Sequence, residues 1–129
     1  MLKLMPITVE LGPEQRRVDV VATGSLTQAE RLAALARCIE LLRAHHGATV
    51  LFDARAAVSA PTAAENREIT EVVSAVASVF VSGVAIVLKP GAQYGMARML
   101  QALLADRGVA VAVFTDITAA ASWLGAHNV

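Results

Sequence analysis

The feature that most constrains this chain is a unit in which a short apolar strand leads directly into a helix. Its last copy runs from Val109 to Gly125, where an apolar run ends at Thr115-Asp116 and a helical segment containing Trp123-Leu124 follows. Strand patterns separated by helical patterns are typical of parallel sheets, because a parallel pair of strands needs a long crossover connection. A chain built from such units is expected to adopt an α/β fold.

Hydrophobic periodicity predicts five strands and four helices along the rest of the chain. Residues 2–11 alternate and are expected to form an edge strand, antiparallel to a second strand over 18–23. Further strands are expected at 49–53, 84–88 and 109–114, each after a helix, and the last four strands are expected to be parallel. The predicted order is β-β-α-β-α-β-α-β-α, a mixed five-stranded sheet with four helices in a single domain over 1–129.

Two of the helices are expected to begin with a capping box, in which a Thr and a Glu three residues later bond each other's backbone amides. Thr27 with Glu30 and Thr62 with Glu65 have this spacing. The apolar stripe of the first helix is Leu32, Leu35, Ala36, Ile39 and Leu42, and that of the second is Ile69, Val72, Val73, Val76 and Phe80.

Composition narrows the classes of function. The formal net charge is zero, so no nucleic acid is expected as a partner. The single cysteine, Cys38, cannot form an internal disulfide and is compatible with a reducing compartment. The first residues, MLKLMPITVEL, lack the apolar core and cleavage site of a signal peptide, so a cytoplasmic protein is expected.

The run from Val72 to Leu88 carries no charged residue and is just long enough to raise the question of a membrane-spanning helix. A soluble interpretation is favoured, because the helical stripe ends near Gly83 and a β-branched strand, VAIVL, follows it. No membrane span is therefore expected.

The order of elements, Gly24-Ser25-Leu26-Thr27 at the first helix, the strands LFDAR and VAIVL and the ending VFTDITAAASWL together resemble the SpoIIAA-like fold. Within it the chain resembles the bacterial STAS-like domain family of small uncharacterised proteins, which is similar in fold to the CRAL-TRIO lipid carriers. The likeness covers roughly residues 16–126. It implies helices mainly on one face of the sheet and says little about activity.

The best-understood relatives in that fold are anti-sigma-factor antagonists, which carry a phosphorylatable serine in an Asp-Ser-x-Gly motif after the third strand. Aligning on Asp53 places the acceptor near Thr62, between Pro61 and Ala63-Ala64, so the hydroxyl is kept and the motif is not. A phosphate at a helix N-terminus is physically favourable. A role as helix cap explains Thr62 equally, and phosphorylation of Thr62 or Ser59 is the weaker alternative.

Candidate ligand-binding or regulatory residues follow the carboxyl ends of the parallel strands, where ligands of open α/β sheets bind. Beside Thr62, this set comprises Asp53, Arg55, Lys89, Tyr94, Arg98 and Asp116. The three basic side chains would suit an anion, assisted by helix N-terminal amides. The favoured alternative is that the two aspartates bond loop amides and that the basic groups are solvated.

No metal, cofactor or catalytic residue is expected. His45 and His46 are adjacent and would point about 100° apart on a helix, and Cys38 has no further ligands at zinc-like spacing. The chain has no Gly-x-Ser-x-Gly elbow, Walker loop or Gly-x-Gly-x-x-Gly run. We therefore expect the protein not to be an enzyme.

Two functions remain open. The first is a non-enzymatic interaction or regulatory domain that forms a homodimer or binds a protein partner, since 56% of the residues are hydrophobic and one sheet face would present Leu51, Val87 and Val111 or their alternates. The second is a carrier of a small apolar or anionic molecule, or of a lipid. Its pocket would be lined by Phe80, Tyr94, Met96, Met99 and Trp123, although ordinary core packing accounts for the same residues.

Overall fold

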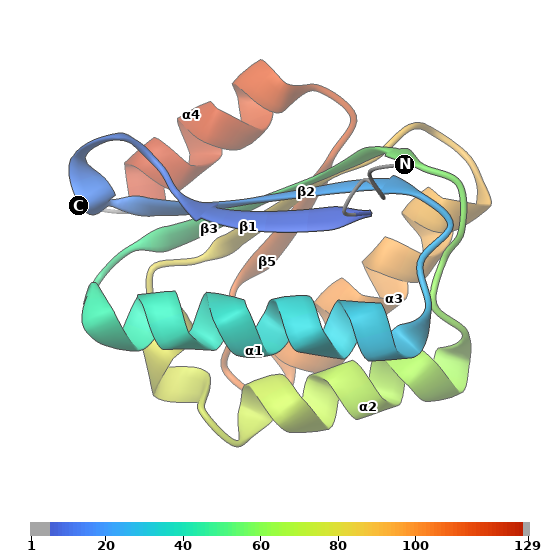
Figure 1. Ribbon diagram of the computed structural model, residues 1–129, viewed down its shortest axis with the longest axis horizontal. Coiled ribbons are helices and arrows are strands. Elements are labelled where there is room, and N and C mark those ends of the chain that lie inside the picture. Colours follow the sequence, from blue (N-terminus) through green and yellow to red (C-terminus); the bar gives the residue numbers. More distant parts are fainter. Residues whose placement is uncertain (1–5, 128–129) are drawn as a thin grey trace, which may run out of the picture.

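Five strands and four helices follow one another in the computed structural model, which describes residues 6–127 (Figure 1). The strands are β1 (Ile7–Leu11), β2 (Arg17–Gly24), β3 (Thr49–Ala57), β4 (Val84–Val87) and β5 (Val111–Phe114). The helices are α1 (Gln28–Ala44), α2 (Ala63–Ser74), α3 (Ala92–Ala105) and α4 (Ile117–His127), with 3₁₀ turns η1 (Pro13–Gln15) and η2 (Ala77–Phe80). The expected α/β class, with a mixed five-stranded sheet and four helices, is confirmed. Residues 2–5 of the first expected strand lie outside the described residues.

The strands lie in the sheet in the same order as in the sequence, β1-β2-β3-β4-β5. β1 is antiparallel to β2, and the pairs from β2 to β5 are parallel. This order arises because each helix carries the chain one strand further in the same direction. β3 is longer than expected and contains a bulge: Val21 of β2 pairs with Asp53, whereas Thr23 pairs with Ala56.

Helices cover the two faces of the sheet unequally. Figure 1 shows α1, α2 and α3 together on one face and α4 on the other. The main core lies between the sheet and the first three helices, and β2 contributes Val18, Val20 and Ala22 to it. A smaller core lies under α4. Because β3 and β4 have helices on both faces, they carry buried apolar side chains in both directions, such as Val50 and Leu51 of β3.

The three residues expected to meet a partner are not exposed. Leu51 and Val87 are packed against Ala120 and Leu124 of α4. Val111 points to the opposite face, into the main core. The expectation that these three residues are presented to a partner is therefore wrong, because the last helix folds back over the face that the other three leave uncovered.

Both expected capping boxes are present. The amide of Glu30 donates to Thr27 Oγ1 at 3.1 Å, and the amide of Thr27 donates to Glu30 Oε1 at 2.8 Å. At α2 the corresponding distances between Thr62 and Glu65 are 3.1 and 2.9 Å. These bonds pair backbone amides that the first turn of a helix leaves without an intrahelical partner.

The buried stripes of α1 and α2 differ from those expected. Ala36 of α1 is exposed, and Val72 of α2 is 37% exposed. In α2 the fully buried positions include two polar residues, Asn66 and Thr70. The reason is that α2 packs mainly against α3, which turns its buried side away from Val72.

The charge-free run 72–88 is divided among three elements: the end of α2, the turn η2 and the strand β4. Within residues 6–127, no helix is long and apolar enough to cross a membrane.

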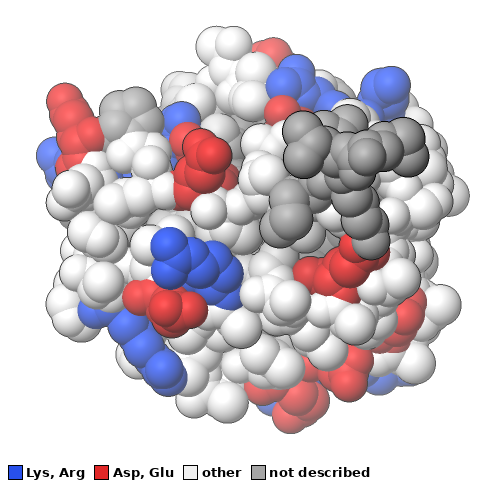
Figure 2. All heavy atoms as spheres, in the orientation of Figure 1, with Lys and Arg blue, Asp and Glu red and all other residues white. Residues whose placement is uncertain are grey.

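On the face drawn in Figure 2, acidic and basic side chains are interspersed, and several acidic ones lie toward the ends at which α1 and α2 begin. The helix dipole favours this placement of carboxylates. Together with the zero formal net charge, it leaves no broad basic surface on this face.

Candidate functional site

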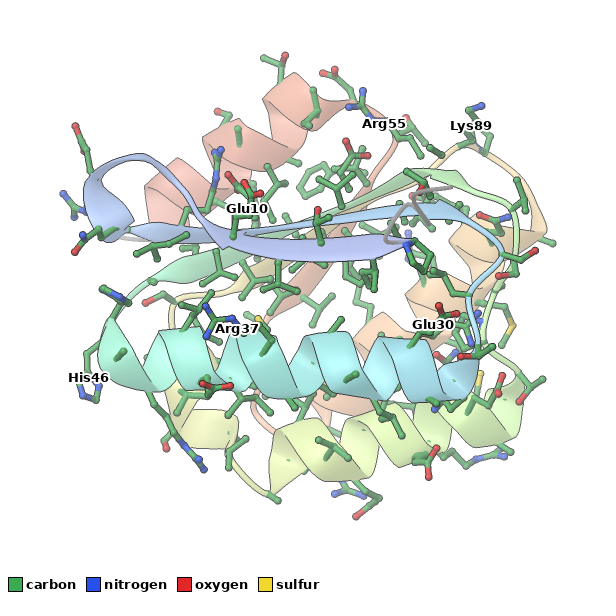
Figure 3. All side chains as sticks on the ribbon, in the orientation of Figure 1. Glu10, Glu30, Arg37, His46, Arg55 and Lys89 are labelled. Atoms are coloured by element: carbon green, nitrogen blue, oxygen red, sulfur yellow. The ribbon has the colours of Figure 1, made fainter. Side chains whose placement is uncertain are left out.

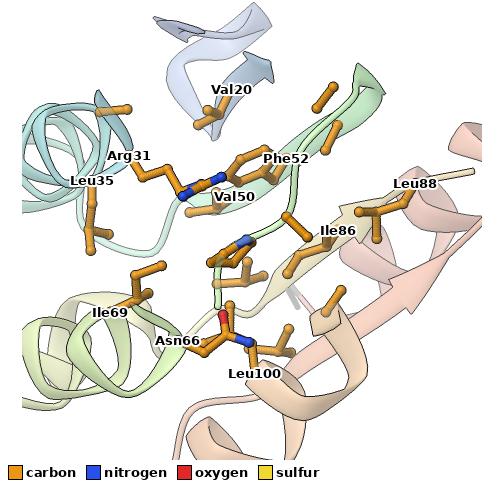
Figure 4. Close-up of a pocket in the computed structure, with 18 of the residues that line it drawn as sticks. Val20, Arg31, Leu35, Val50, Phe52, Asn66, Ile69, Ile86, Leu88 and Leu100 are labelled. Carbon is orange, nitrogen blue, oxygen red and sulfur yellow. The ribbon is translucent and has the colours of Figure 1, made fainter. Parts of the chain in front are cut away.

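A cavity of about 160 Å³ lies between the sheet and the first three helices (Figure 4). Its walls are mostly aliphatic and aromatic side chains from β2, β3, β4, α1, α2 and α3. They include Val20, Leu35, Val50, Phe52, Ile69, Phe80, Ile86, Leu88, Ala97 and Leu100. For comparison, an apolar cavity of about 150 Å³ made in another protein stays dry and binds benzene. The volume here therefore suits a molecule the size of one aromatic ring.

Arg31 and Asn66 place polar groups in this apolar wall. Figure 4 shows Arg31 extending from α1 and Asn66 from α2. Both positions continue an apolar stripe by one turn toward the helix N-terminus, Arg31 before Leu35 and Asn66 before Ile69 and Val73. They are buried because the apolar stripe faces the core. Their polar groups must therefore find hydrogen-bond partners inside the fold.

The guanidinium of Arg31 is held where α1 and α2 begin, and only 10% of its side chain is exposed. It lies 3.6 Å from Glu65 Oε1 and donates to the Ser59 hydroxyl and to Gln28 Oε1, each at 3.4 Å. Ser59 also accepts from the amide of Leu26 at 2.9 Å. These contacts tie the loop before α2 to the start of α1 beside the cavity.

Asn66 is completely buried and makes one side-chain hydrogen bond, from Nδ2 to the carbonyl oxygen of Met96 at 3.0 Å. A carbonyl oxygen only accepts, so the amide can be oriented in one way only. Oδ1 therefore points away from α3, and it has no hydrogen-bond partner among the described residues. A buried acceptor without a partner is unusual in folded proteins and calls for an explanation.

Cys38 lies in the cavity wall and is 3% exposed. Burial raises the pKa of its thiol to about 12. The thiol is therefore neutral near pH 7 and serves as a small apolar side chain, not as a nucleophile.

The candidate residues at the sheet edge form a second, separate cluster. Arg55 donates to Asp53 from Nε at 2.9 Å and from Nη2 at 2.8 Å. These bonds lower the pKa of Asp53, and the pKa of Arg55 is raised by the same bonds and, more weakly, by the charge of Asp116. Arg55 and Lys89 line one shallow depression, and Figure 3 shows them at the same edge of the sheet. The guanidinium of Arg55 is already hydrogen-bonded to the carboxylate of Asp53. The depression is therefore not a built anion site.

The other expected site residues have separate positions. Thr62 is the cap of α2, and Asp116 caps α4 by accepting from the amide of Ala119 at 3.2 Å. Arg98 is exposed on α3, and Tyr94 packs against the main core. None of these four residues lines the cavity or the depression.

The aromatic and methionine side chains expected to line a pocket are also dispersed. Of Phe80, Tyr94, Met96, Met99 and Trp123, only Phe80 lines the cavity. Trp123 lies on the opposite face of the sheet, where its ring centroid is 6.1 Å from that of Phe114. The cavity is instead built from smaller side chains of the strands and helices.

The described part of the chain has no group of three or more His, Cys, Asp or Glu residues placed to hold a metal ion. No protein-family model, curated protein or solved structure matches this sequence. Any function must therefore be argued from the geometry of the cavity and of the sheet edge.

Proposed function

We propose that this protein is a non-enzymatic binding domain that holds one compact, mostly apolar molecule in the cavity between the sheet and α1–α3. The cavity itself is the observation that carries this proposal. Protein interiors are packed to crystal-like density, with few voids larger than a water molecule. A pocket of about 160 Å³ among the core side chains of so small a domain leaves apolar surface uncovered unless a ligand fills it.

The volume of the cavity limits the size of the ligand. Pockets for drug-sized molecules usually enclose roughly 300–1,000 Å³, so about 160 Å³ suits a single ring better than a long acyl chain. Of the carriers considered from the sequence, a small-molecule carrier is favoured over a lipid carrier.

The homodimeric interaction domain is less well supported. Its apolar docking face was expected around Leu51 and Val87, which α4 covers. On the part of that face outside α4, β2 carries the ion pair between Arg17 and Asp19, whose side chains are 33% and 30% exposed. A homodimer stays a prediction, and light scattering at high protein concentration tests it.

Membership of the STAS-like family is likewise a proposal. It is supported by four successive strand-helix units after an antiparallel first strand, with the strands in sequential order. An experimental structure tests it, because a different strand order would contradict it.

Thermal unfolding with and without toluene tests the binding function. Toluene should raise the unfolding temperature of the wild-type protein, since a ligand that binds only the folded state stabilises it. Ala97→Leu, which fills the cavity from α3, should abolish the shift. Ala102→Leu is the matched control, because Ala102 is exposed on the same helix, and it should keep the shift.

If Ala97→Leu does not fold, Ala34→Leu fills the cavity from α1 and takes its place, since Ala34 is buried in the same wall. A wild-type protein whose unfolding temperature is unchanged both at saturating toluene and at saturating phenol would contradict the proposal. An equal shift in wild type and in both filling variants would place the toluene elsewhere and would also contradict it.

A further inference from the structure

We propose that Asn66 makes the cavity selective, so that its ligand is a neutral one-ring molecule with a single hydrogen-bond donor, a hydroxyl or an N–H group, directed at Asn66 Oδ1. This inference rests on the proposed binding function and adds the ligand's chemical class to it. The observation behind it is a fully buried amide oxygen that belongs to a residue of the cavity wall and has no partner among the described residues.

The orientation of Asn66 is what aims the oxygen into the cavity. Nδ2 is held by the carbonyl oxygen of Met96 at 3.0 Å, so rotating the amide by 180° would set two acceptors against each other. Figure 4 shows the Asn66 oxygen directed toward the space enclosed by the lining side chains. The group offered to a ligand at this point is thus an acceptor.

A buried hydrogen-bond acceptor favours a ligand that carries a hydrogen-bond donor. A hydroxyl or N–H group on the ligand would pair with Oδ1, whereas a carboxylate would place two acceptors face to face. Most of the remaining wall is apolar, with Arg31, Ser59 and Gln93 as its other polar residues, which favours a ligand whose other atoms are mainly carbon. Phenol is the simplest molecule with this arrangement.

Arg31 is the one charged side chain in the cavity wall, and it offers a competing anchor for an anion. Its guanidinium is directed at Ser59, Gln28 and Glu65 on the loop and helix ends. Glu65 supplies a negative charge that would oppose a second carboxylate. We therefore assign the selective contact to Asn66, and benzoate serves to test the alternative.

Phenol and toluene form the decisive pair, because they have nearly the same shape and differ in a hydroxyl against a methyl group. An entirely apolar cavity would prefer toluene, since phenol would lose its hydrogen bond to water without replacement. We expect the wild-type protein to bind phenol at least as tightly as toluene, measured by calorimetric titration.

Asn66→Leu removes the oxygen while keeping a side chain of similar size. The affinity for phenol relative to toluene should then fall by about tenfold, as expected for the loss of one hydrogen bond. Thr70→Val is the matched control: Thr70 is also buried on α2, bonds only the Asn66 carbonyl with its hydroxyl at 2.8 Å, and does not line the cavity. It should leave the phenol preference unchanged.

The outcomes separate the two proposals. Binding of neither phenol nor toluene to the wild-type protein would overturn the binding function and this inference together. Tighter binding of toluene than of phenol would overturn the inference alone. Benzoate binding more tightly than phenol would point to Arg31 and would also overturn it. If Asn66→Leu does not fold, the ratio of the affinities for phenol and toluene, measured in wild type and in Thr70→Val, still tests the inference.

Discussion

Asp53 and Arg55, with one residue between them on β3, are joined by two side-chain hydrogen bonds of 2.9 and 2.8 Å. The amide of Arg55 also donates to Asp53 Oδ1 at 3.2 Å. In a regular strand, side chains two apart share a face but stand well separated along the chain. Here the bulge after Asp53 changes the local backbone direction, which accompanies the close approach of the two side chains.

This pair predicts a specific dependence of stability on pH. The pKa of Asp53 is lowered, first by its side-chain hydrogen bonds with Arg55. The pair therefore stabilises the folded state above the unfolded-state pKa of about 3.9, and this contribution is lost as the pH falls through the lower folded-state value. Asp53→Asn should have a lower unfolding temperature than wild type near pH 7, and the gap should close in acid.

Calorimetric scans between neutral and acidic pH measure this gap. Glu40→Gln is the control, because Glu40 and its partner Arg37 are 70% and 53% exposed and such surface pairs contribute little. A gap for Asp53→Asn that stays constant across the pH range would contradict the assignment.

Thr62 is expected to act as a helix cap. Thr62→Ala removes the acceptor for the Glu65 amide and should lower the free energy of unfolding by about 1 kcal/mol. Thr62→Ser keeps the hydroxyl and should be close to wild type in urea denaturation. A phosphate on Thr62 would stand beside the Glu65 carboxylate, which accepts from the Thr62 amide at 2.9 Å, so phosphorylation should destabilise the start of α2.

Gly95 and Gly108 should respond in opposite ways to the same substitution. A Cβ at either position meets no atom within 4 Å, but Gly108 has a φ of +79°. Gly95→Ala should stabilise α3 by up to about 1 kcal/mol through helix propensity. Gly108→Ala should destabilise by roughly 1–2 kcal/mol, because the left-handed region disfavours a side chain. Urea denaturation of both variants measures the change in the free energy of unfolding. Changes of the same sign would contradict the backbone conformation described for one of the two glycines.

Cys38 should resist thiol reagents in the native protein. Its side chain is 3% exposed, and burial raises the thiol pKa to about 12. At pH 8 the reagent therefore cannot reach the sulfur, and the thiol is not ionised to the reactive thiolate. Ellman's reagent should react with one thiol rapidly in guanidinium chloride and only very slowly without it. Fast reaction of the folded protein would show that the wall of the cavity opens readily.

Much of the fold could be predicted from local signals. The capping boxes at Thr27 and Thr62 depend on residues three apart, and both are present. Asp116, one of the two aspartates expected to bond nearby amides, accepts amide hydrogen bonds at the start of α4. Such features involve one segment at a time, so spacing alone is enough to find them.

The cavity could not be predicted in the same way. Arg31 and Asn66 carry residue types that are usually exposed, so neither is among the residues of the expected apolar stripes. Extending the stripes back by one turn, from Leu35 to Arg31 and from Val73 through Ile69 to Asn66, was the signal available in the sequence. It shows that a position faces the core, but not whether its polar group finds a partner there.

The sequence by itself determined the α/β class, with five strands in a mixed sheet and four helices, because periodicity and caps are properties of neighbouring residues. Only the tertiary structure decided that α4 covers Leu51 and Val87, and that three helices leave a cavity of about 160 Å³ against the sheet. Those outcomes depend on how the volumes of side chains from distant segments add up where the elements meet. They also depend on whether a buried polar atom such as Asn66 Oδ1 meets a complementary group, which no local pattern encodes.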